Sequence, residues 1–351
     1  MAKRESIIVG LEIEPAAVHA AAVTVNGKVE IRDAAVSPLE AGIVRDGEVH
    51  DVEGLADALR ALYAEHKGLS KKVRIGVANQ KIVVRILELP PITDQKELAA
   101  AVRFSAQDQI PMPLDSAVVD FHPLGIVETE AGSRQRVLIV AARRDMIDRV
   151  VSACRAAGLR PEGVDLSAFA MIRALYRTTG NDTEPVLYLS IGGLTNLAVA
   201  EGPTCLFTRV VGGGLEAIAL ELAERKALTL EHARGWLTHV GLVSPLEDVE
   251  TDGQDEIADE ARSVLLDGVR RIGSEVRNSL DFHHAQEGMS LRVQRAMLTG
   301  AAAAVPGFAD ALAAELGLPV ETGEVAGTPD GLESHLLTVA AGLAVEEAPH
   351  A

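Results

Sequence analysis

The sequence is poor in aromatic residues, in cysteine and in positive charge. Aromatic side chains make up 3 % of the 351 residues, although 48 % are hydrophobic. The cores must therefore be built from Val, Leu, Ile and Ala, a bias that is typical of sheets covered by helices on both faces. The length is sufficient for two domains with sizeable cores.

The charge balance argues against two classes of partner. There are 51 Asp and Glu residues against 33 Lys and Arg, which gives a formal net charge of −18. Nucleic acids and anionic lipid surfaces attract clustered basic residues, so we expect no nucleic-acid partner and no binding to anionic lipid. The two cysteines, Cys154 and Cys205, form no CxxC pattern, which predicts reduced, buried thiols as in a cytosolic protein.

Long hydrophobic runs are also missing from the sequence. No segment approaches the ~20 apolar residues that are needed to span a bilayer. Residues 1–5 lead into a short apolar strand rather than into a signal-peptide core. We therefore expect a cytoplasmic protein without membrane insertion, which reaches the inner face of the cell membrane only through partners.

A β-β-β-α order occurs twice along the chain. Each copy has three short apolar runs separated by turn residues and then an amphipathic helix. The strands are predicted at 6–13, 18–25 and 28–34, then at 185–190, 195–200 and 204–211, and the helices at 52–66 and 215–225. Asn26-Gly27 is a strong hairpin signal and predicts the turn between the second and third strands. This duplication predicts an α/β protein with the two-half architecture of the actin, Hsp70 and sugar-kinase superfold.

The same pattern predicts a division into four parts. They are a first half (1–81 with 159–183), an inserted subdomain (82–158), a second half (184–225 with 291–351) and a helical subdomain (226–290). Within the first half, residues 164–175 are expected to form a helix. Within the helical subdomain, residues 245–260 carry eight acidic residues and no Lys or Arg, which predicts a solvated loop.

The segment at 84–121 contains a helix with a clear signal at each end. Asp94 with Glu97 three residues later is a capping-box pattern, and Pro111 cannot continue a helix. Between these ends, Leu98 and Val102 recur at the spacing of a single buried face.

This segment resembles, in its amino-acid sequence, the inserted subdomain of the PilM family of type IV pilus assembly proteins. Its sequence is VRILELPPITDQKELAAAVRFSAQDQIPMPLDSAVVDF. SEVRNSLDFHHAQ, at 274–286, is similar to the long helix that precedes the adenosine strand in that family. The resemblance runs from Ser6 to about Val345. It implies a duplicated actin-like fold whose inserted subdomain is placed as in the cell-division protein FtsA.

The resemblance also implies an ATP site in which two hairpins cradle the phosphates with backbone N–H groups. The first hairpin of the family resembles Asp-Ile-Gly-Ser-Ser-Ser-Val-Lys, whereas this chain has EIEPAAVH at 12–19. Glu14 puts a carboxylate where phosphates would lie, and each unit-charge repulsion is about 4 kcal/mol at ~4 Å with an effective dielectric of ~20. Pro15 lacks an N–H, and His19 is a poor substitute for lysine. Glu12 retains a carboxylate that suits Mg²⁺.

The second hairpin and the adenosine turn keep more of the family pattern. Ser190 stands where the family has Asp, and Ala301 and Ala302 narrow a turn that has consecutive glycines in the family. The residues that the resemblance assigns to a nucleotide are Glu12, Gly192, Gly193, Thr195, Asn196, Gly213, Gly214, Glu275 and Gly300. The departures favour a pseudo-ATPase with no cofactor and no catalytic residue; ATP with Mg²⁺ is the alternative that the resemblance implies.

The resemblance further implies a membrane-protein partner, PilN, whose cytoplasmic N-terminal peptide binds between the first half and the inserted subdomain. The candidate groove residues are Arg85, Leu87, Arg103, Phe104 and Gln107. Leu87 and Phe104 are also candidates for the core, which is the more common place for either residue taken singly. Other pilus platform proteins, the assembly ATPase and a second copy of the chain are further expected partners.

Two alternative functions remain at this point: an ATP-hydrolysing switch of the same family, and an FtsA-like cell-division protein. The second needs a basic amphipathic C-terminal helix, whereas residues 344–351 are acidic and contain Pro349.

Overall fold

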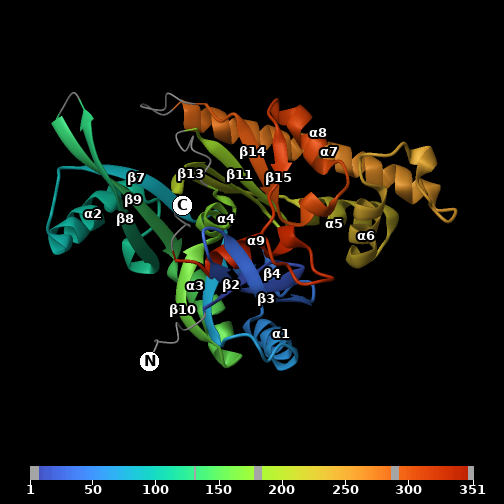
Figure 1. Ribbon diagram of the computed structural model, residues 1–351, viewed down its shortest axis with the longest axis horizontal. Coiled ribbons are helices and arrows are strands. Elements are labelled where there is room, and N and C mark those ends of the chain that lie inside the picture. The colour runs from blue at the N-terminus through green and yellow to red at the C-terminus, as the bar shows by residue number, and fades with distance from the viewer. Residues whose placement is uncertain (1–7, 130–131, 178–183, 286–291, 347–351) are drawn as a thin grey trace. The chain divides into compact units, whose positions relative to one another are not determined.

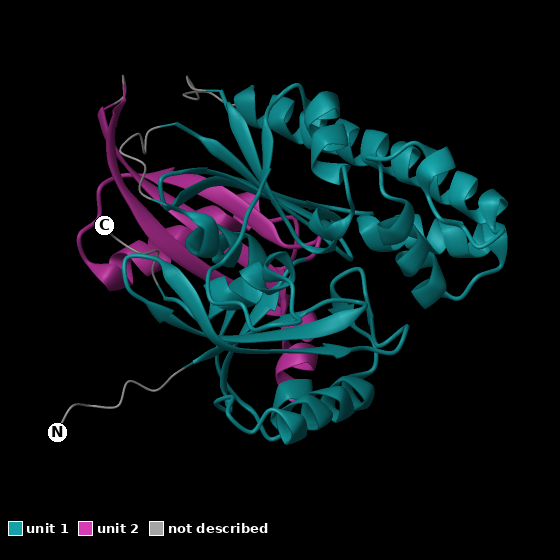
Figure 2. Cartoon of the chain, turned by 45° about the vertical axis from the view of Figure 1, so that its right-hand side comes forward, with its two compact units in different colours: residues 1–78, 153–351 teal, residues 79–152 magenta. Residues whose placement is uncertain are grey.

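The computed structural model describes residues 8–129, 132–177, 184–285 and 292–346 (Figure 1). The expected features at 1–7 and 347–351 lie outside these residues. The chain forms two compact units, which we call unit 1 (1–78 with 153–351) and unit 2 (79–152) (Figure 2). In the described part of the chain no helix is both long and apolar enough to cross a membrane.

Unit 1 contains a first five-stranded sheet in the order β10-β6-β1-β2-β3. Its strands are β1 (Val9–Ile13), β2 (Ala17–Val25), β3 (Val29–Pro38), β6 (Lys72–Val77) and β10 (Arg160–Leu166). β1, β2 and β3 pair antiparallel, and β6 pairs parallel with both β1 and β10. The predicted Asn26-Gly27 turn joins β2 to β3, with Gly27 at φ 69°. The short strands β4 (Val44–Arg45) and β5 (Glu48–Val49) and helix α1 (Val52–Glu65) follow β3.

A second five-stranded sheet repeats this arrangement in the order β13-β12-β11-β14-β15. Its strands are β11 (Val186–Ile191), β12 (Thr195–Glu201), β13 (Thr204–Val211), β14 (Arg295–Thr299) and β15 (Val320–Thr322). The first three again form an antiparallel meander, and helix α5 (Leu215–Lys226) follows it. The predicted duplication is confirmed.

Two helices connect the two sheets of unit 1. Helix α4 (Ser167–Leu175) packs in a core with β11 and β12, whereas α9 (Ser334–Leu343) packs in a core with β2 and β3. The helices approach so closely that a Cβ added at Gly342 would lie 1.8 Å from the Ala170 carbonyl oxygen. The helix predicted at 164–175 begins only at Ser167, because residues 164–166 extend the parallel ladder of β10 with β6.

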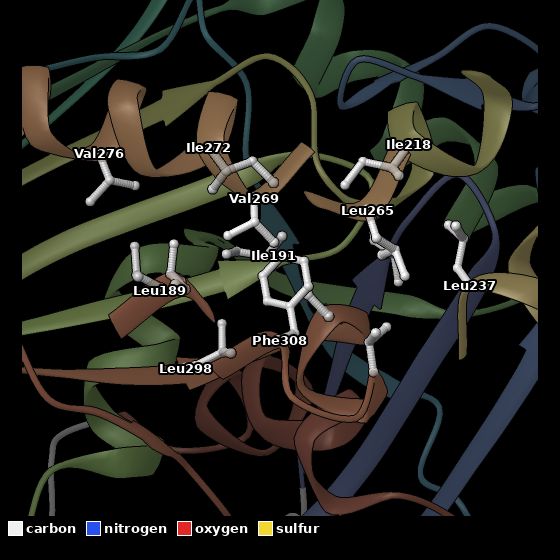
Figure 3. Packing of buried hydrophobic residues seen from close by; sticks show 14 of the residues in the cluster. Leu189, Ile191, Ile218, Leu237, Leu265, Val269, Ile272, Val276, Leu298 and Phe308 are labelled. Atoms are coloured by element: carbon white, nitrogen blue, oxygen red, sulfur yellow. The ribbon is translucent and has the colours of Figure 1, made fainter. Parts of the chain in front are cut away.

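Further helices pack on the second sheet or on its helix α5. They are α6 (Leu230–Val240), α7 (Asp255–His284) and α8 (Phe308–Leu316), with 3₁₀ turns η2 (Leu246–Asp248) and η3 (Ala301–Ala304). Phe308 is fully buried among Leu265, Val269 and Ile191, which come from α7 and β11 (Figure 3). The core is aliphatic, as the composition predicts.

The acidic segment at 245–260 is not a loop throughout, so that expectation was wrong. Helix α7 begins at Asp255, and Asp255 and Glu256 lie in its first turn. Carboxylates are stabilised there by the exposed N–H groups and the dipole of the helix. Glu260, one turn later, accepts a 2.7 Å hydrogen bond from Arg225 of α5.

Unit 2 has a three-stranded antiparallel sheet in the order β7-β9-β8, packed against one helix. Its elements are β7 (Val83–Leu89), α2 (Gln95–Gln109), η1 (Leu114–Ser116), β8 (Ala117–Thr129) and β9 (Gly132–Arg143), after which α3 (Arg144–Ala156) begins. Asp94 caps α2 by accepting from the Lys96 and Glu97 N–H groups at 2.9 Å. Leu98 and Val102 are buried, as the spacing predicts.

Candidate functional site

Two tight turns of unit 1 carry the residues that the sequence singles out. Hairpin 1 joins β1 to β2 through Glu14-Pro15-Ala16, and the Glu14 N–H donates to the Ala17 carbonyl at 2.9 Å. Hairpin 2 joins β11 to β12 through Gly192-Gly193-Leu194, and the Gly192 N–H donates to the Leu194 carbonyl at 3.0 Å. The equivalent strand pairs of the two halves thus end in equivalent turns.

The two turns touch each other directly. The Glu14 carboxylate accepts a 3.2 Å hydrogen bond from the Gly193 N–H. A Cβ added at Gly192 would lie 2.2 Å from Glu14 Oε2, and one added at Gly193 would lie 2.4 Å from Pro15 Cδ. Hairpin 2 accommodates Glu14 and Pro15 only because these two positions lack side chains.

A second acidic residue and a histidine lie beside Glu14. Glu12 and His19 face each other across the β1–β2 ladder, both are buried, and His19 Nδ1 lies 3.4 Å from Glu12 Oε2. Burial, reinforced by the charge of Glu12, raises the pKa of Glu14 to about 7, although His19 and the Gly193 N–H act in the opposite direction. Burial alone would lower the pKa of His19, but the adjacent Glu12 and Glu14 raise it above its ordinary value.

Gly300 has a structural reason of its own to be glycine. It has a φ of 83°, and an added Cβ would lie 2.9 Å from both the backbone N and O of Ile191. Its N–H donates to the His335 carbonyl at 3.1 Å, at the start of α9. The turn after β14 therefore needs glycine for its packing on the end of β11, whether or not it contacts an adenosine.

Most of the other predicted nucleotide residues gather around hairpin 2. Thr195 Oγ1 donates to the Gly213 carbonyl at 2.7 Å, and a Cβ added at Gly214 would lie 2.3 Å from the Gly192 carbonyl oxygen. Asn196 is buried, and its Oδ1 has no hydrogen-bond partner among the described residues. Glu275 is different: it lies exposed on α7, and none of the side-chain bonds of the described residues joins it to either hairpin.

The set of groups around the hairpins fits a nucleotide poorly. The Gly193 N–H already has a carboxyl acceptor from its own chain, and Pro15 supplies no N–H beside it. Glu12 has His19 as its neighbour, and Ser190 puts a buried hydroxyl where a second carboxylate would be needed. In the described ranges, no group of three or more His, Cys, Asp or Glu residues is arranged to hold a metal ion.

The five residues proposed to contact a peptide all lie in unit 2, but they differ in exposure. Leu87 is 6 % exposed and belongs to the core between the sheet and α2, so it is not accessible to a partner. Arg85 is exposed on β7. Arg103 and Gln107 lie one turn apart on the exposed part of α2, and Phe104, between them, has 74 % of its surface exposed.

A pocket of about 500 Å³ opens beside α2 in the same unit. α2, η1, β8 and the first residue of α3 line it, through Ala99, Val102, Arg103, Leu114, Asp115, Ala117, Val118, Val119, Phe121 and Arg144. Arg103 is the predicted residue that it includes. Phe121 and Arg144 were not predicted from the sequence, although the apolar alternation of Ala117, Val119 and Phe121 was a signal for one face of β8.

Comparison with solved structures defines the class of protein. The ethanolamine utilization protein EutJ from Carboxydothermus hydrogenoformans is 17 % identical with a TM-score of 0.54, and the match covers 96 % of this chain and 88 % of that one. MreB5 of Spiroplasma citri bound to AMPPNP is 12 % identical with a TM-score of 0.51, covering 95 % and 94 %. The chain has the actin-like ATPase fold, as the sequence predicts.

The family is narrower than the fold. The model of the type IV pilus assembly protein PilM family matches residues 10–239, so the chain belongs to that family. A solved PilM-PilN type IV pilus biogenesis complex is 27 % identical with a TM-score of 0.79, and the match covers 97 % of this chain and 98 % of that one. The resemblance stated from the sequence is confirmed.

Proposed function

We propose that this protein is an actin-like scaffold on the cytoplasmic side of the type IV pilus assembly platform. The observation that carries the proposal is its similarity, over 97 % of its length, to a chain solved as part of a PilM-PilN complex. Its principal partner would be a PilN-like inner-membrane protein, recognised through that protein's cytoplasmic N-terminal peptide. Association with the membrane would then depend on this partner.

Unit 2 supplies part of the binding surface in this proposal. A hydrophobic peptide needs apolar surface that folding has left exposed, and Phe104 offers such surface on α2. Arg103 and Gln107 flank Phe104 and supply donors for peptide carbonyl groups. Arg85 extends this surface onto β7, whereas the buried Leu87 supports it from within.

We infer that the nucleotide site is degenerate and that the protein is a pseudo-ATPase. A phosphate group that binds to hairpin 2 would have to displace the Glu14 carboxyl group from the Gly193 N–H. The displaced group would remain close to the phosphate, and its negative charge would repel it. The retained Thr195, Asn196 and Gly213 favour the alternative, an ATP-dependent switch of the same family. We favour a scaffold that functions without ATP, because Pro15 removes a backbone donor and Glu14 adds negative charge at the phosphate position.

The proposal includes further partners and a finer domain division. Other platform proteins, the assembly ATPase and self-association would attach to the same scaffold. The boundaries 1–81 with 159–183, 82–158, 184–225 with 291–351, and 226–290 describe its four parts.

A binding titration tests the function directly. A synthetic peptide with the N-terminal cytoplasmic sequence of the PilN-like protein from the same organism is titrated into the full chain and followed by fluorescence anisotropy. We expect saturable binding at micromolar concentration, which corresponds to about −8 kcal/mol, and none with a scrambled peptide of equal composition. Equal binding of both peptides, or of neither, would refute the proposal.

A further inference from the structure

We propose that Glu14 and Pro15 form an intramolecular latch, in which the Glu14 carboxyl group takes the place of a nucleotide phosphate on the Gly193 N–H and holds the two halves of unit 1 together. The proposal rests on the proposed function in one respect, that the hairpins bind no nucleotide. It identifies what closes the two halves in the absence of a nucleotide.

The contact joins parts of the chain that are remote in sequence. Glu14 follows β1 of the first sheet, Gly193 follows β11 of the second, and 179 positions separate them. The halves are also joined by the packing of α4 and α9 and by a 2.8 Å bond from the Ile31 N–H of β3 to the Ala326 carbonyl. The bond from Gly193 to Glu14 differs from these because it joins the two equivalent turns directly. If the two halves separate, this bond breaks. It can therefore hold the halves together in the way that a phosphate bound to both hairpins would.

The shape of hairpin 2 matches Glu14 and Pro15 specifically. Side chains at Gly192 and Gly193 would collide with the Glu14 carboxyl group and with the Pro15 ring respectively. The two glycines therefore have a role that requires no nucleotide. They leave room for Glu14 and Pro15 of hairpin 1, and the Gly193 N–H donates to Glu14 there.

The charges around Glu14 determine how firmly the latch closes. The groups that act on it are Glu12 and His19 from β1 and β2, Glu216 from α5 and the Gly193 N–H from hairpin 2. Only His19 and the N–H favour the charged form, and Arg234 already pairs with Glu216. Burial, which is the largest effect, disfavours the charged form together with Glu12 and Glu216, and these effects outweigh the N–H and His19. The closed latch therefore favours a Glu14 that is protonated, or a neutral acceptor of the same shape.

Substitutions at Glu14 separate these contributions. Glu14→Ala removes the acceptor, whereas Glu14→Gln keeps an oxygen of the same reach without the charge. Losing one hydrogen bond changes an opening equilibrium by about tenfold. We therefore expect amide exchange at Gly193 to accelerate about tenfold in Glu14→Ala and to stay at the wild-type rate or slower in Glu14→Gln. Glu40→Ala, an exposed glutamate in the same half, is the matched control and should change nothing.

The separation of the halves is measured in the same full-length variants with two spin labels. Exposed Lys28→Cys and Glu231→Cys carry the labels, since native Cys154 and Cys205 are buried. We expect one narrow distance distribution in the wild type and in Glu14→Gln, and a longer, broader one in Glu14→Ala. If Glu14→Ala does not fold, Glu14→Asp, which is one methylene too short, provides the same test. Unchanged exchange and unchanged distances in Glu14→Ala, or in Glu14→Asp, would overturn the latch. Peptide binding is measured separately, so its failure would refute the proposed function alone.

Discussion

The Glu14 carboxylate of the first hairpin accepts a hydrogen bond from the Gly193 backbone N–H of the second at 3.2 Å. A phosphate-cradling N–H would need to be available to an external anion, whereas this one is bonded within the chain. The same contact explains why Gly192 and Gly193 carry no side chains. Several measurable properties depend on this relationship.

Replacing Gly193 by Ala should destabilise the protein even without any ligand. The new Cβ would lie 2.4 Å from Pro15 Cδ, and relieving such overpacking costs about 1–3 kcal/mol. Gly235→Ala is the matched control, because no heavy atom lies within 4 Å of its added Cβ and the position is inside α6. That change should stabilise by up to ~1 kcal/mol. Urea denaturation gives the free energy of unfolding of both variants. Equal effects of the two substitutions would contradict the close packing of Gly193 against Pro15.

The pH dependence of stability should carry the sign of a raised carboxyl pKa. The pKa of Glu14 is raised from 4.5 to about 7, so its stabilising contribution is complete below 4.5 and is lost as pH rises through about 7. His19, whose pKa is also raised, adds to the decrease in the same direction. Other carboxyl groups obscure the trend, so the quantity to measure is the wild-type free energy of unfolding minus that of Glu14→Gln. This difference should fall as the pH rises from 5 to 8. An increase would contradict a Glu14 pKa that is raised by folding.

Reversing the charge of Arg103 or removing the aromatic ring of Phe104 should weaken peptide binding if unit 2 supplies the proposed surface. Arg103 lines the pocket and Phe104 is exposed on the same helix, so Arg103→Glu and Phe104→Ala should each lower affinity by about tenfold or more. Lys96→Glu makes the same charge change in the first turn of α2 and serves as the control. The anisotropy titration measures all three. Comparable losses for Lys96→Glu and Arg103→Glu would indicate general electrostatics rather than this surface.

The crossing of α4 and α9 should be intolerant of any added methyl group. In Gly342→Ala the Cβ would lie 1.8 Å from the Ala170 carbonyl oxygen, which forces the two helices apart. We expect a loss of about 3 kcal/mol or more in the free energy of unfolding, at the upper end of overpacking effects. Thermal and urea denaturation of the full chain measure it. A change below ~1 kcal/mol would mean that the helices separate easily.

Local signals in the sequence predicted much of the fold. Asn26-Gly27, the Asp94 cap and the two meanders are found where turn chemistry and apolar periodicity put them, because neighbouring residues determine these features. Residues 164–166 were assigned to a helix because their pairing with β6 is non-local. The start of α7 at Asp255 was missed because an acidic run is compatible with both a loop and a helix N-terminus.

The candidate site was less accessible to sequence reasoning. The mismatch of Glu14 and Pro15 with a phosphate cradle followed from residue chemistry alone. The bond from the Gly193 N–H to Glu14 did not, because it depends on how two turns 179 positions apart approach each other. Leu87 and Phe104 were both candidates for the core; Leu87 is buried beneath α2, whereas Phe104 is exposed, so the sequence did not distinguish the two.

The most direct test of the account is a calorimetric titration of the purified full chain with Mg·ATP, after a check for co-purified nucleotide. Because Glu14 occupies the Gly193 N–H, we expect no heat of binding at millimolar ATP. Binding tighter than ~10 μM, which corresponds to about −7 kcal/mol, would contradict the account. It would show that hairpin 2 releases Glu14 and accepts phosphate in its place.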